Sequence, residues 1–399
     1  DICSFMLAAI ALFAAGSLAK PRLTHVDLAQ GKSYSFSEYM SDFGKKYSKD
    51  ELKYRESIFS EHIEKIRNHN RNSKHGWKMH VNRFTDMHPK EFRRETRGLH
   101  PTVKRSLISL TQISSPQNVS MLKTAPMECE VDWRNHPDFS GIELIGEVAN
   151  QGSCGSCWAF SACETVEAHL AIATKKASPE LSKQELVSCS ENLHACGGTG
   201  GCQGSTQPLA FQYIAENGIS TESQYGYTSG MGSTGSCSRS SMKSHVKCNS
   251  HVELPTNNYE ALMKAICTKG PVAISVDAGS FDWQAYSEGV MKPTEKCSTI
   301  DHAVQLVGVG KESVNGKMIP YWLIRNSWSS GWGEDGYIKL FRHVDSNPAG
   351  SHDNCYMDTQ PSEGFSCKDE TGAYPSQVRV CGTCGILSAS SYPEGCHYV

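Results

Sequence analysis

The sequence predicts an α+β protein with two lobes that follow a separate, basic N-terminal segment. The chain has 399 residues, which is too long for one ordinary domain. Helical patterns dominate its first part, and short apolar strand patterns dominate the part after about residue 270. Residues 20–127 hold 21 Lys and Arg against 11 Asp and Glu, whereas residues 128–399 hold 18 against 30. The two parts therefore carry opposite net charge.

The first residues have the composition of a secretory signal peptide. An apolar run over residues 5–15 precedes the small residues 16–19, and a polar chain follows. The run is shorter than the roughly 20 residues that a membrane-spanning helix needs. We therefore expect residues 1–19 to be a signal peptide, no membrane span, and a protein of the secretory pathway. Lysosome, vacuole and extracellular space remain open.

Within the basic segment, the sequence pattern predicts a helix over residues 33–75 and a short strand over residues 80–86. In the helix, six side chains recur every three or four positions and share one face: Glu51, Arg55, Phe59, His62, Ile66 and Asn70. Residues 80–86 alternate as a strand does. Residues 97–127 have the Pro and Ser content of an exposed linker and hold a glycosylation sequon at Asn118. The segment has no Lys/Arg block, which argues against nucleic acid as a partner.

The acidic remainder begins with helical patterns and ends with strands. Residues 156–174 continue as an amphipathic helix, and the Gly-, Ser- and Cys-rich residues 189–240 predict loops tied by disulfides. Apolar runs then predict strands at residues 271–276, 303–309, 321–325 and 336–341. The order of these elements favours one helical lobe and one β-rich lobe.

The 17 cysteines predict several disulfides, because most cysteines pair in an oxidising compartment. With Cys3 assigned to the signal peptide and Cys157 to chemistry, 15 remain. This odd number leaves at least one further thiol outside the intramolecular bridges. We expect this thiol to be Cys163, because it lies six residues into the helix that begins near Cys157 and suits a small buried side chain.

The stretch from Gln151 to Phe160 is the strongest candidate for a catalytic site. Cys157 stands where a helix begins, and the partial positive charge there favours a thiolate. Two other residues have the chemistry to assist it: His302 at the head of an apolar strand, and Asn326 before two tryptophans. A lone histidine or asparagine is more often structural. A Cys-x-x-Cys pair such as Cys154–Cys157 also occurs in redox and zinc sites.

Taken together, these motifs resemble the papain-like cysteine proteases, and cathepsin L-type members most closely. The resemblance rests on Cys-Gly-Ser-Cys-Trp at 154–158, on His302, and on Asn326-Ser-Trp with Trp332-Gly, and it extends from about residue 35 to the end. It implies a helical lobe over 128–250 and a β-barrel-like lobe over 251–399. It also implies that residues 20–127 are an inhibitory propeptide lying along the cleft.

The helical face of the propeptide and the residues around Asn82, Phe84 and Asp86 match two propeptide motifs of this family. His62 stands where the first motif usually has Asn, and His80 stands where the second usually has Gly. Either departure could weaken the packing of the propeptide.

The resemblance implies a role for each matching residue. Cys157 attacks the scissile carbonyl, His302 protonates the leaving amine, and Asn326 orients the imidazole under the shield of Trp328. The Gln151 amide and the Cys157 N–H bind the oxyanion. Further substrate-binding positions are Gly155, Trp158, Gly204, Ser205, Thr206, Gln207, Ser275, Ile300, Asp301, Ala303, Trp328 and Ala389.

The resemblance also implies three disulfides: Cys154–Cys202, Cys189–Cys237 and Cys297–Cys384. It leaves the pairing of the other cysteines open: Cys129, Cys196, Cys248, Cys267, Cys355, Cys367, Cys381 and Cys396. Several of these lie in or near an insertion at about 343–383, which reads as a disulfide-tied surface loop. Its Cys381-Gly-Thr-Cys384 could be redox-active or bind zinc, although separate structural bridges are favoured.

The expected protein is a monomeric endopeptidase zymogen that cuts proteins and peptides, is inhibited by its own propeptide, and uses no cofactor or metal. Because no acid stands at Ala389, we expect an open pocket preferring Leu, Val or Phe two residues before the cut, with no inserted loop blocking the cleft. Ser205 stands in place of a usual glycine, and Thr206 and Gln207 are more polar than is usual at these positions.

We also expect acid to start maturation, because protonating carboxylates below about pH 4–5 weakens the attraction between the basic and acidic parts. The rival readings are a catalytically silent homologue and a thioredoxin-like oxidoreductase that uses Cys154 and Cys157.

Overall fold

The computed structural model describes residues 21–399 except 22, 73, 98–127, 240–241 and 345–353. The expected signal peptide, the linker after residue 97 and the sequon at Asn118 lie outside the described residues. None of the helices in the described part of the chain is long and apolar enough to cross a membrane.

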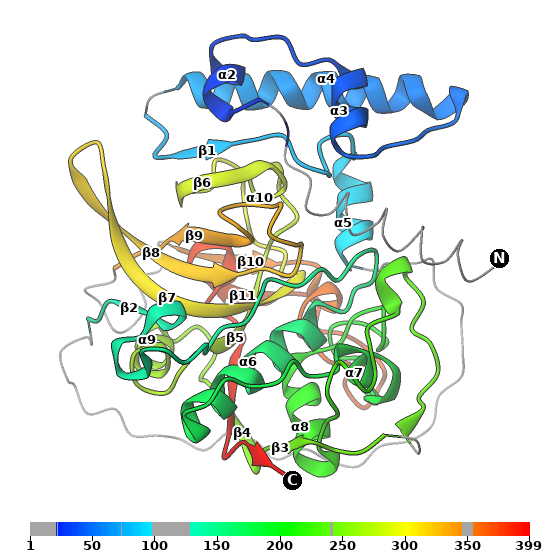
Figure 1. The fold of residues 1–399 in the computed structure, drawn as a ribbon, viewed down its shortest axis with the longest axis vertical. Coiled ribbons are helices and arrows are strands. Elements are labelled where there is room, and N and C mark those ends of the chain that lie inside the picture. The colour runs from blue at the N-terminus through cyan, green and yellow to red at the C-terminus, as the bar shows by residue number, and fades with distance from the viewer. Residues whose placement is uncertain (1–20, 22, 73, 98–127, 240–241, 345–353) are drawn as a thin grey trace.

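The helices fall into a basic N-terminal group and a group in the body of the molecule (Figure 1). The α-helices are α2 (His25–Ala29), α3 (Phe36–Asp42), α4 (Lys49–Arg71), α5 (Pro89–Arg97), α6 (Cys157–Thr174), α7 (Lys183–Cys189), α8 (Gln207–Asn217), α9 (Tyr259–Thr268) and α10 (Phe281–Ala285). The short 3-10 helices are η1 (Trp133–Asn135), η2 (Pro137–Phe139), η3 (Ser229–Met231), η6 (Pro361–Glu363) and η7 (Thr383–Gly385).

Most strands join one sheet. The strands are β1 (Trp77–Met79), β2 (Val131–Asp132), β3 (Val246–Lys247), β4 (Ser250–Glu253), β5 (Val272–Val276), β6 (Tyr286–Met291), β7 (His302–Val314), β8 (Lys317–Arg325), β9 (Tyr337–Phe341), β10 (Cys355–Asp358), β11 (Val378–Cys381), β12 (Ser390–Glu394) and β13 (His397–Tyr398). Within the described residues, nine strands form a sheet in the order β1-β6-β9-β8-β7-β5-β12-β4, and β2 also pairs with β7. All four strand predictions in this region are confirmed.

The N-terminal segment contributes a strand to this sheet. β1 pairs antiparallel with β6, so that Trp77 lies opposite Gly289. Figure 1 shows β1 between α4 and β6, with α2, α3 and α4 together at one end of the molecule. The segment is therefore attached to the body by backbone hydrogen bonds as well as by side chains.

The predicted single helix over 33–75 is wrong, because the structure has two helices there. α3 and α4 are separated by residues 43–48, where Gly44 adopts a positive φ of 62° that suits glycine. A new helix then starts at Ser48, whose hydroxyl accepts the backbone N–H of Glu51. The predicted shared face of α4 is confirmed, because Phe59, His62, Ile66 and Asn70 are all buried.

The predicted strand over 80–86 is also wrong. The strand is β1, at 77–79, and residues 80–86 form irregular turns. The reason is the side chain of Asn82, whose Oδ1 accepts the N–H of Phe84 and whose Nδ2 donates to the carbonyl of Gln284. Such local bonds compete with a strand. They direct Asn82 and Phe84 toward the body of the protein.

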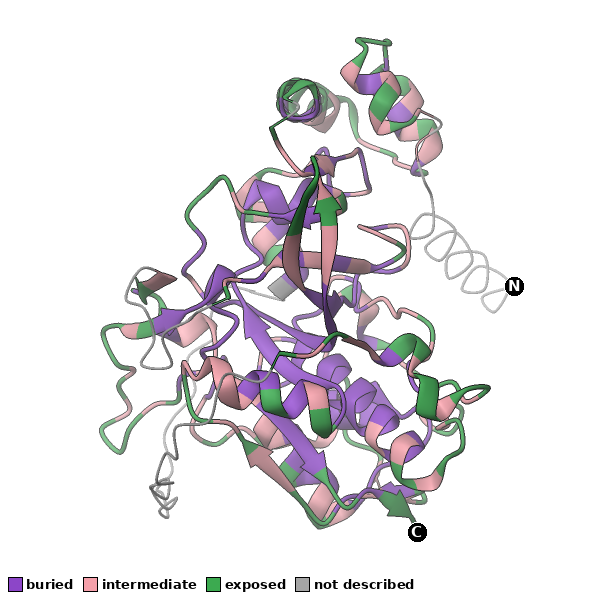
Figure 2. Ribbon diagram, turned by 90° about the vertical axis from the view of Figure 1, so that its left-hand side faces the viewer, coloured by how far each residue is buried: buried purple, intermediate pink, exposed green. Residues whose placement is uncertain are grey.

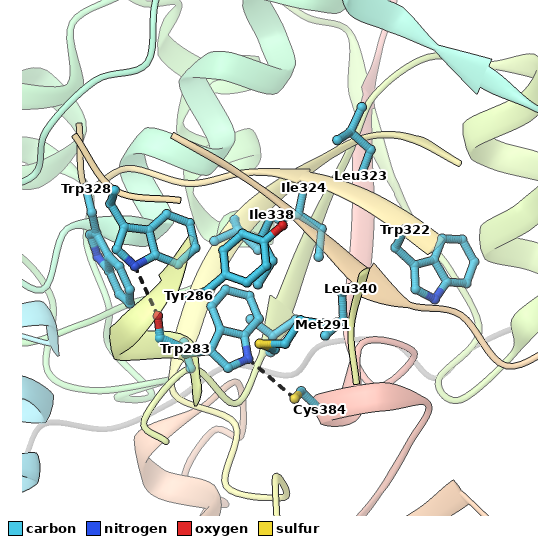
Figure 3. Close-up of a cluster of buried hydrophobic side chains, with 14 of the residues drawn as sticks. Trp283, Tyr286, Met291, Trp322, Leu323, Ile324, Trp328, Ile338, Leu340 and Cys384 are labelled. Carbon is cyan, nitrogen blue, oxygen red and sulfur yellow. Dashed lines mark hydrogen bonds between the residues drawn. The ribbon is translucent and has the colours of Figure 1, made fainter. Parts of the chain in front are cut away.

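A cluster of aromatic and aliphatic side chains fills the β-rich lobe (Figure 3). Trp283 is fully buried in it, and its Nε1 donates to Cys384 Sγ at 3.4 Å. Figure 2 shows the same lobe as a band of buried strands surrounded by more exposed loops. The buried sheet gives the residues at its strand ends a rigid support.

Seven disulfides link the described residues: Cys129–Cys267, Cys154–Cys202, Cys189–Cys237, Cys196–Cys367, Cys248–Cys396, Cys297–Cys384 and Cys355–Cys381. Three of them are the pairs that the resemblance implied. Cys163 is buried outside these bridges, as expected, and burial raises the pKa of its thiol.

Candidate active site

Cys157 is the first residue of α6 and sits at the N-terminus of an 18-residue helix. Its side chain is 8% exposed. The helix begins without a side-chain cap, because the Ser156 hydroxyl is hydrogen-bonded to the hydroxyl of Tyr227 at 2.7 Å instead. The backbone N–H groups of the first turn and the positive end of the helix thus surround the sulfur.

His302 and Asn326 come from neighbouring strands. His302 opens β7, and Asn326 follows the last residue of β8. The His302 Nε2–H donates to Asn326 Oδ1 at 2.8 Å, and the same oxygen accepts the backbone N–H of Ser327. The second bond fixes which end of the Asn326 amide faces the ring. Trp328 stacks on His302 with ring centroids 4.7 Å apart and covers this pair.

Gln151 is fully buried and its side-chain amide is fixed at both ends. Its Oε1 accepts the hydroxyl of Ser327 at 2.6 Å, and its Nε2 donates to the carbonyl of Cys154 at 2.9 Å. The backbone N–H of Gln151 also donates to the Ser327 carbonyl. Ser327 therefore orients Gln151 and Asn326 together, a role that sequence reasoning missed.

A buried ion pair lies beneath these residues. Arg325 directly precedes Asn326, and its Nη2 lies 3.6 Å from Oε1 of Glu164 in α6. Both side chains are at most 3% exposed. Burial raises the pKa of Glu164 to about 7, and Arg325 offsets only part of this effect. The pair connects the helix that begins at Cys157 with the strand that ends at Arg325.

One pocket contains Cys157 and His302. It is lined by most of the predicted substrate-binding residues, namely Gly155, Gly204, Ser205, Gln207, Ser275, Ile300, Asp301 and Ala303, and by Gly197, Gly198, Gln203, Ser362, Glu363 and Gly364. Residues from both lobes thus meet around the sulfur and the imidazole.

Four predicted substrate-binding residues do not line this pocket. Trp158 is fully buried and donates its Nε1–H to the carbonyl of Gly201. Thr206 stands at the N-cap of α8, and Trp328 covers His302. The carbonyl of Ala389 accepts the N–H of Ser275, so Ala389 lies next to the pocket lining.

The insertion, expected to be a surface loop, also reaches the pocket that contains Cys157. Ser362, Glu363 and Gly364 of the insertion form part of the pocket wall. Sequence reasoning missed them because Cys196 and Cys367, which hold this loop in place, are 171 residues apart, and spacing alone does not reveal which cysteines pair.

The basic segment contacts the site directly. The carbonyl of Thr96, in α5, accepts the Nε2–H of Gln151 at 2.8 Å, and Phe92 packs edge-on against Trp328 with centroids 5.3 Å apart. The Ser153 hydroxyl donates to Glu95. The Thr96 carbonyl thus accepts a hydrogen bond from the Gln151 amide, which is the group that the resemblance assigns to binding the oxyanion.

A family model described as "Papain family cysteine protease" matches residues 127–365, and one described as "Cathepsin propeptide inhibitor domain (I29)" matches residues 36–92. The chain belongs to the papain family of cysteine proteases. It is a zymogen in which an N-terminal propeptide precedes the protease. The predicted papain-like fold, mixed α and β with a helical propeptide, is confirmed.

Similar proteins share both parts. Procathepsin L of Mus musculus is 35% identical over 321 residues, which are 79% of this chain and 89% of that protein. Digestive cysteine proteinase 3 of Homarus americanus is 34% identical over 83% of this chain and 94% of its own length. The solved structure of procathepsin L 3 from the Tenebrio molitor larval midgut has a TM-score of 0.63 at 29% identity, with 90% and 97% of the two chains covered.

The structure argues against the redox and zinc alternatives. Cys154 pairs with Cys202 and not with Cys157, while Cys381 and Cys384 belong to separate bridges with Cys355 and Cys297. No group of three or more potential metal ligands occurs in the described parts of the chain.

Proposed function

We propose that this zymogen matures into a cysteine endopeptidase whose nucleophile is Cys157. The main support is the meeting of Cys157, at the N-terminus of α6, with His302 in a single pocket. Nε2 of His302 donates to Asn326, so its Nδ1 is the nitrogen that takes the thiol proton. The result is a thiolate–imidazolium pair.

The chemistry proceeds in two halves. The Cys157 thiolate attacks the scissile carbonyl carbon, and the carbonyl oxygen becomes an oxyanion. The Gln151 amide and the Cys157 backbone N–H stabilise this oxyanion. Imidazolium Nδ1–H of His302 then protonates the leaving amine as the C–N bond breaks, which leaves a thioester. Water, deprotonated by His302, hydrolyses the thioester and restores the thiol.

The bound propeptide is proposed to inhibit the enzyme by accepting a hydrogen bond from the Gln151 side-chain amide. The Gln151 amide that would hold the oxyanion is hydrogen-bonded to the Thr96 carbonyl, and α5 covers Trp328. No oxyanion can bind Gln151 until this contact opens. Cleavage in the linker at 97–127 would then free the mature enzyme.

Acid is proposed to start this maturation. The propeptide is basic and the remainder acidic, so protonation of carboxylates weakens their attraction. High salt at neutral pH is expected to have part of the same effect. A zymogen that matures equally fast at pH 7 and pH 4.5 would contradict this proposal.

Seven disulfides in the described residues indicate folding in the oxidising secretory pathway. A lysosomal, vacuolar or extracellular site, glycosylation at Asn118 and a monomeric state remain proposals.

The test is labelling of acid-treated protein with an epoxide inhibitor of thiolate proteases, combined with cleavage of N-terminally blocked peptides. Labelling at Cys157, its loss in Cys157→Ala, and cleavage of blocked peptides support an endopeptidase. Cleavage of only unblocked peptides would indicate an exopeptidase. Absence of both labelling and cleavage would indicate a catalytically silent homologue.

A further inference from the structure

The insertion at about 343–383 is joined to both lobes. At its base, β10 and β11 pair antiparallel and are bridged by Cys355–Cys381. Its middle crosses to the helical lobe, where Cys367 forms a disulfide with Cys196. Around this disulfide, the N–H of Gly197 donates to the Ser366 carbonyl at 3.0 Å, and the N–H of Lys368 donates to the His194 carbonyl at 2.9 Å.

These bonds hold residues 362–364 against both sides of the substrate pocket. A Cβ on Gly364 would lie 2.6 Å from the Ile300 carbonyl oxygen, and a Cβ on Gly197 would lie 2.4 Å from the Gly364 carbonyl oxygen. Asp358 of β10 accepts the N–H of Ile300 at 3.0 Å. Because backbone meets backbone at both contacts, the insertion forms a fixed wall of the pocket.

The pocket that results is acidic and polar. Its lining includes the acidic residues Glu363 and Asp301 and no Lys or Arg, and the Asp301 carboxylate accepts the backbone N–H of Ala278 at 2.9 Å. Ile300 and Ala303 are its aliphatic members, whereas Gln203, Gln207 and three serines are polar.

Ser205 gives an independent sign of a polar ligand. Its side chain is only 8% exposed, and its hydroxyl oxygen has no hydrogen-bond partner within the described residues. A buried hydroxyl without a partner is unfavourable, and a donor supplied by a ligand would satisfy it.

We propose that the insertion makes this enzyme selective for a basic substrate side chain, Arg or Lys, in the pocket beside Cys157. Glu363 supplies the negative charge, Ser205 accepts a hydrogen bond, and Cys196–Cys367 holds the charged wall in place. This inference rests on the proposed peptidase function. It replaces the expected preference for Leu, Val or Phe, which rested on the absence of an acid at Ala389.

The test compares two blocked reporters that differ only in charge. One has Arg two residues before the cut, and the other has citrulline, the neutral isostere of Arg, at the same place. Wild-type enzyme is expected to cleave the Arg reporter with a kcat/KM about tenfold or more higher, the usual scale of a charge-assisted hydrogen bond. Glu363→Gln is expected to bring the ratio close to one.

Glu370→Gln is the matched control, because Glu370 is exposed on the same insertion and is absent from the pocket lining. It is expected to keep the wild-type ratio. Equal cleavage of both reporters by the wild type, or an unchanged ratio in Glu363→Gln, would overturn the inference while Cys157 labelling still supports the peptidase. Failure of wild-type labelling and cleavage would instead overturn the proposed function, and this inference with it.

Discussion

Replacement of His80 by Gln is expected to slow the proposed opening of the propeptide by acid. His80 follows β1, and its Nδ1 accepts the backbone N–H of Val81 at 2.7 Å. Protonation of Nδ1 would break this bond. Burial, reinforced by the nearby His25, lowers the pKa of His80 to about 4. His25 itself pairs with Glu288 of the mature protein at 3.3 Å.

The sign of the effect follows from this lowered pKa. A released propeptide exposes His80, and the pKa returns to the ordinary value of 6.5. The docked state therefore has its full stability above pH 6.5 and loses stability as the pH falls toward 4. At pH 5 the difference between the two pKa values lowers the free energy of propeptide docking by about 2 kcal/mol. This shifts the docking equilibrium about 30-fold toward release. Gln does not titrate, so His80→Gln removes this shift.

The assay measures cleavage of inactive zymogens by a trace of mature enzyme. Each zymogen carries Cys157→Ala, and the rates with and without His80→Gln are compared at the same pH. We expect similar rates at pH 7, and at pH 5 a rate that is slower by up to about 30-fold in the variant. His397→Gln, at an exposed position near the C-terminus, is the control. A variant-to-parent ratio that is the same at pH 5 and pH 7 would refute the reasoning.

Three further changes test the site. Gln151→Ala should lower kcat about 100- to 1000-fold by removing an oxyanion donor, and an unchanged kcat would reject that role. Asn326→Ala should lower kcat/KM about 10- to 100-fold, because the hydrogen bond to His302 is lost. Full activity in the Asn326→Gln variant would show that the position of the amide is unimportant. Phe92→Ala should weaken propeptide docking at Trp328 by about 3–5 kcal/mol and so permit maturation at neutral pH. A Phe92→Ala zymogen that stays intact at pH 7 would contradict this prediction.

The sequence predicted those features that depend on local pattern. The helix beginning near Cys157 and the four strands of the second lobe follow from periodicity within short windows. The grouping of Cys157, His302 and Asn326 came from motifs that specify particular residue types around each. The position of Cys157 and His302 in one pocket depends on the fold, and the family resemblance supplied that fold.

The errors arose where side-chain bonds override a pattern. Residues 80–86 alternate like a strand, yet the Asn82 side chain bonds to the backbone of Phe84 and Gln284 and holds the chain in turns. The insertion was read as a surface loop because its composition is polar. Its place in the pocket depends on the Cys196–Cys367 bridge and on close packing of Gly364, and neither is a local property of the sequence.

The propeptide contacts also suggest an order for its release. The contact that blocks the site, Gln151 with Thr96, joins an amide to a carbonyl, and neither group titrates. The half-buried His80 lies instead next to the β1–β6 pairing, and its backbone N–H donates to the Ala285 carbonyl. Under the proposed acid trigger, protonation of His80 would weaken the attachment of the β1 end, and the α5 end would lose that support. Substitutions at either end should consequently change the pH of maturation.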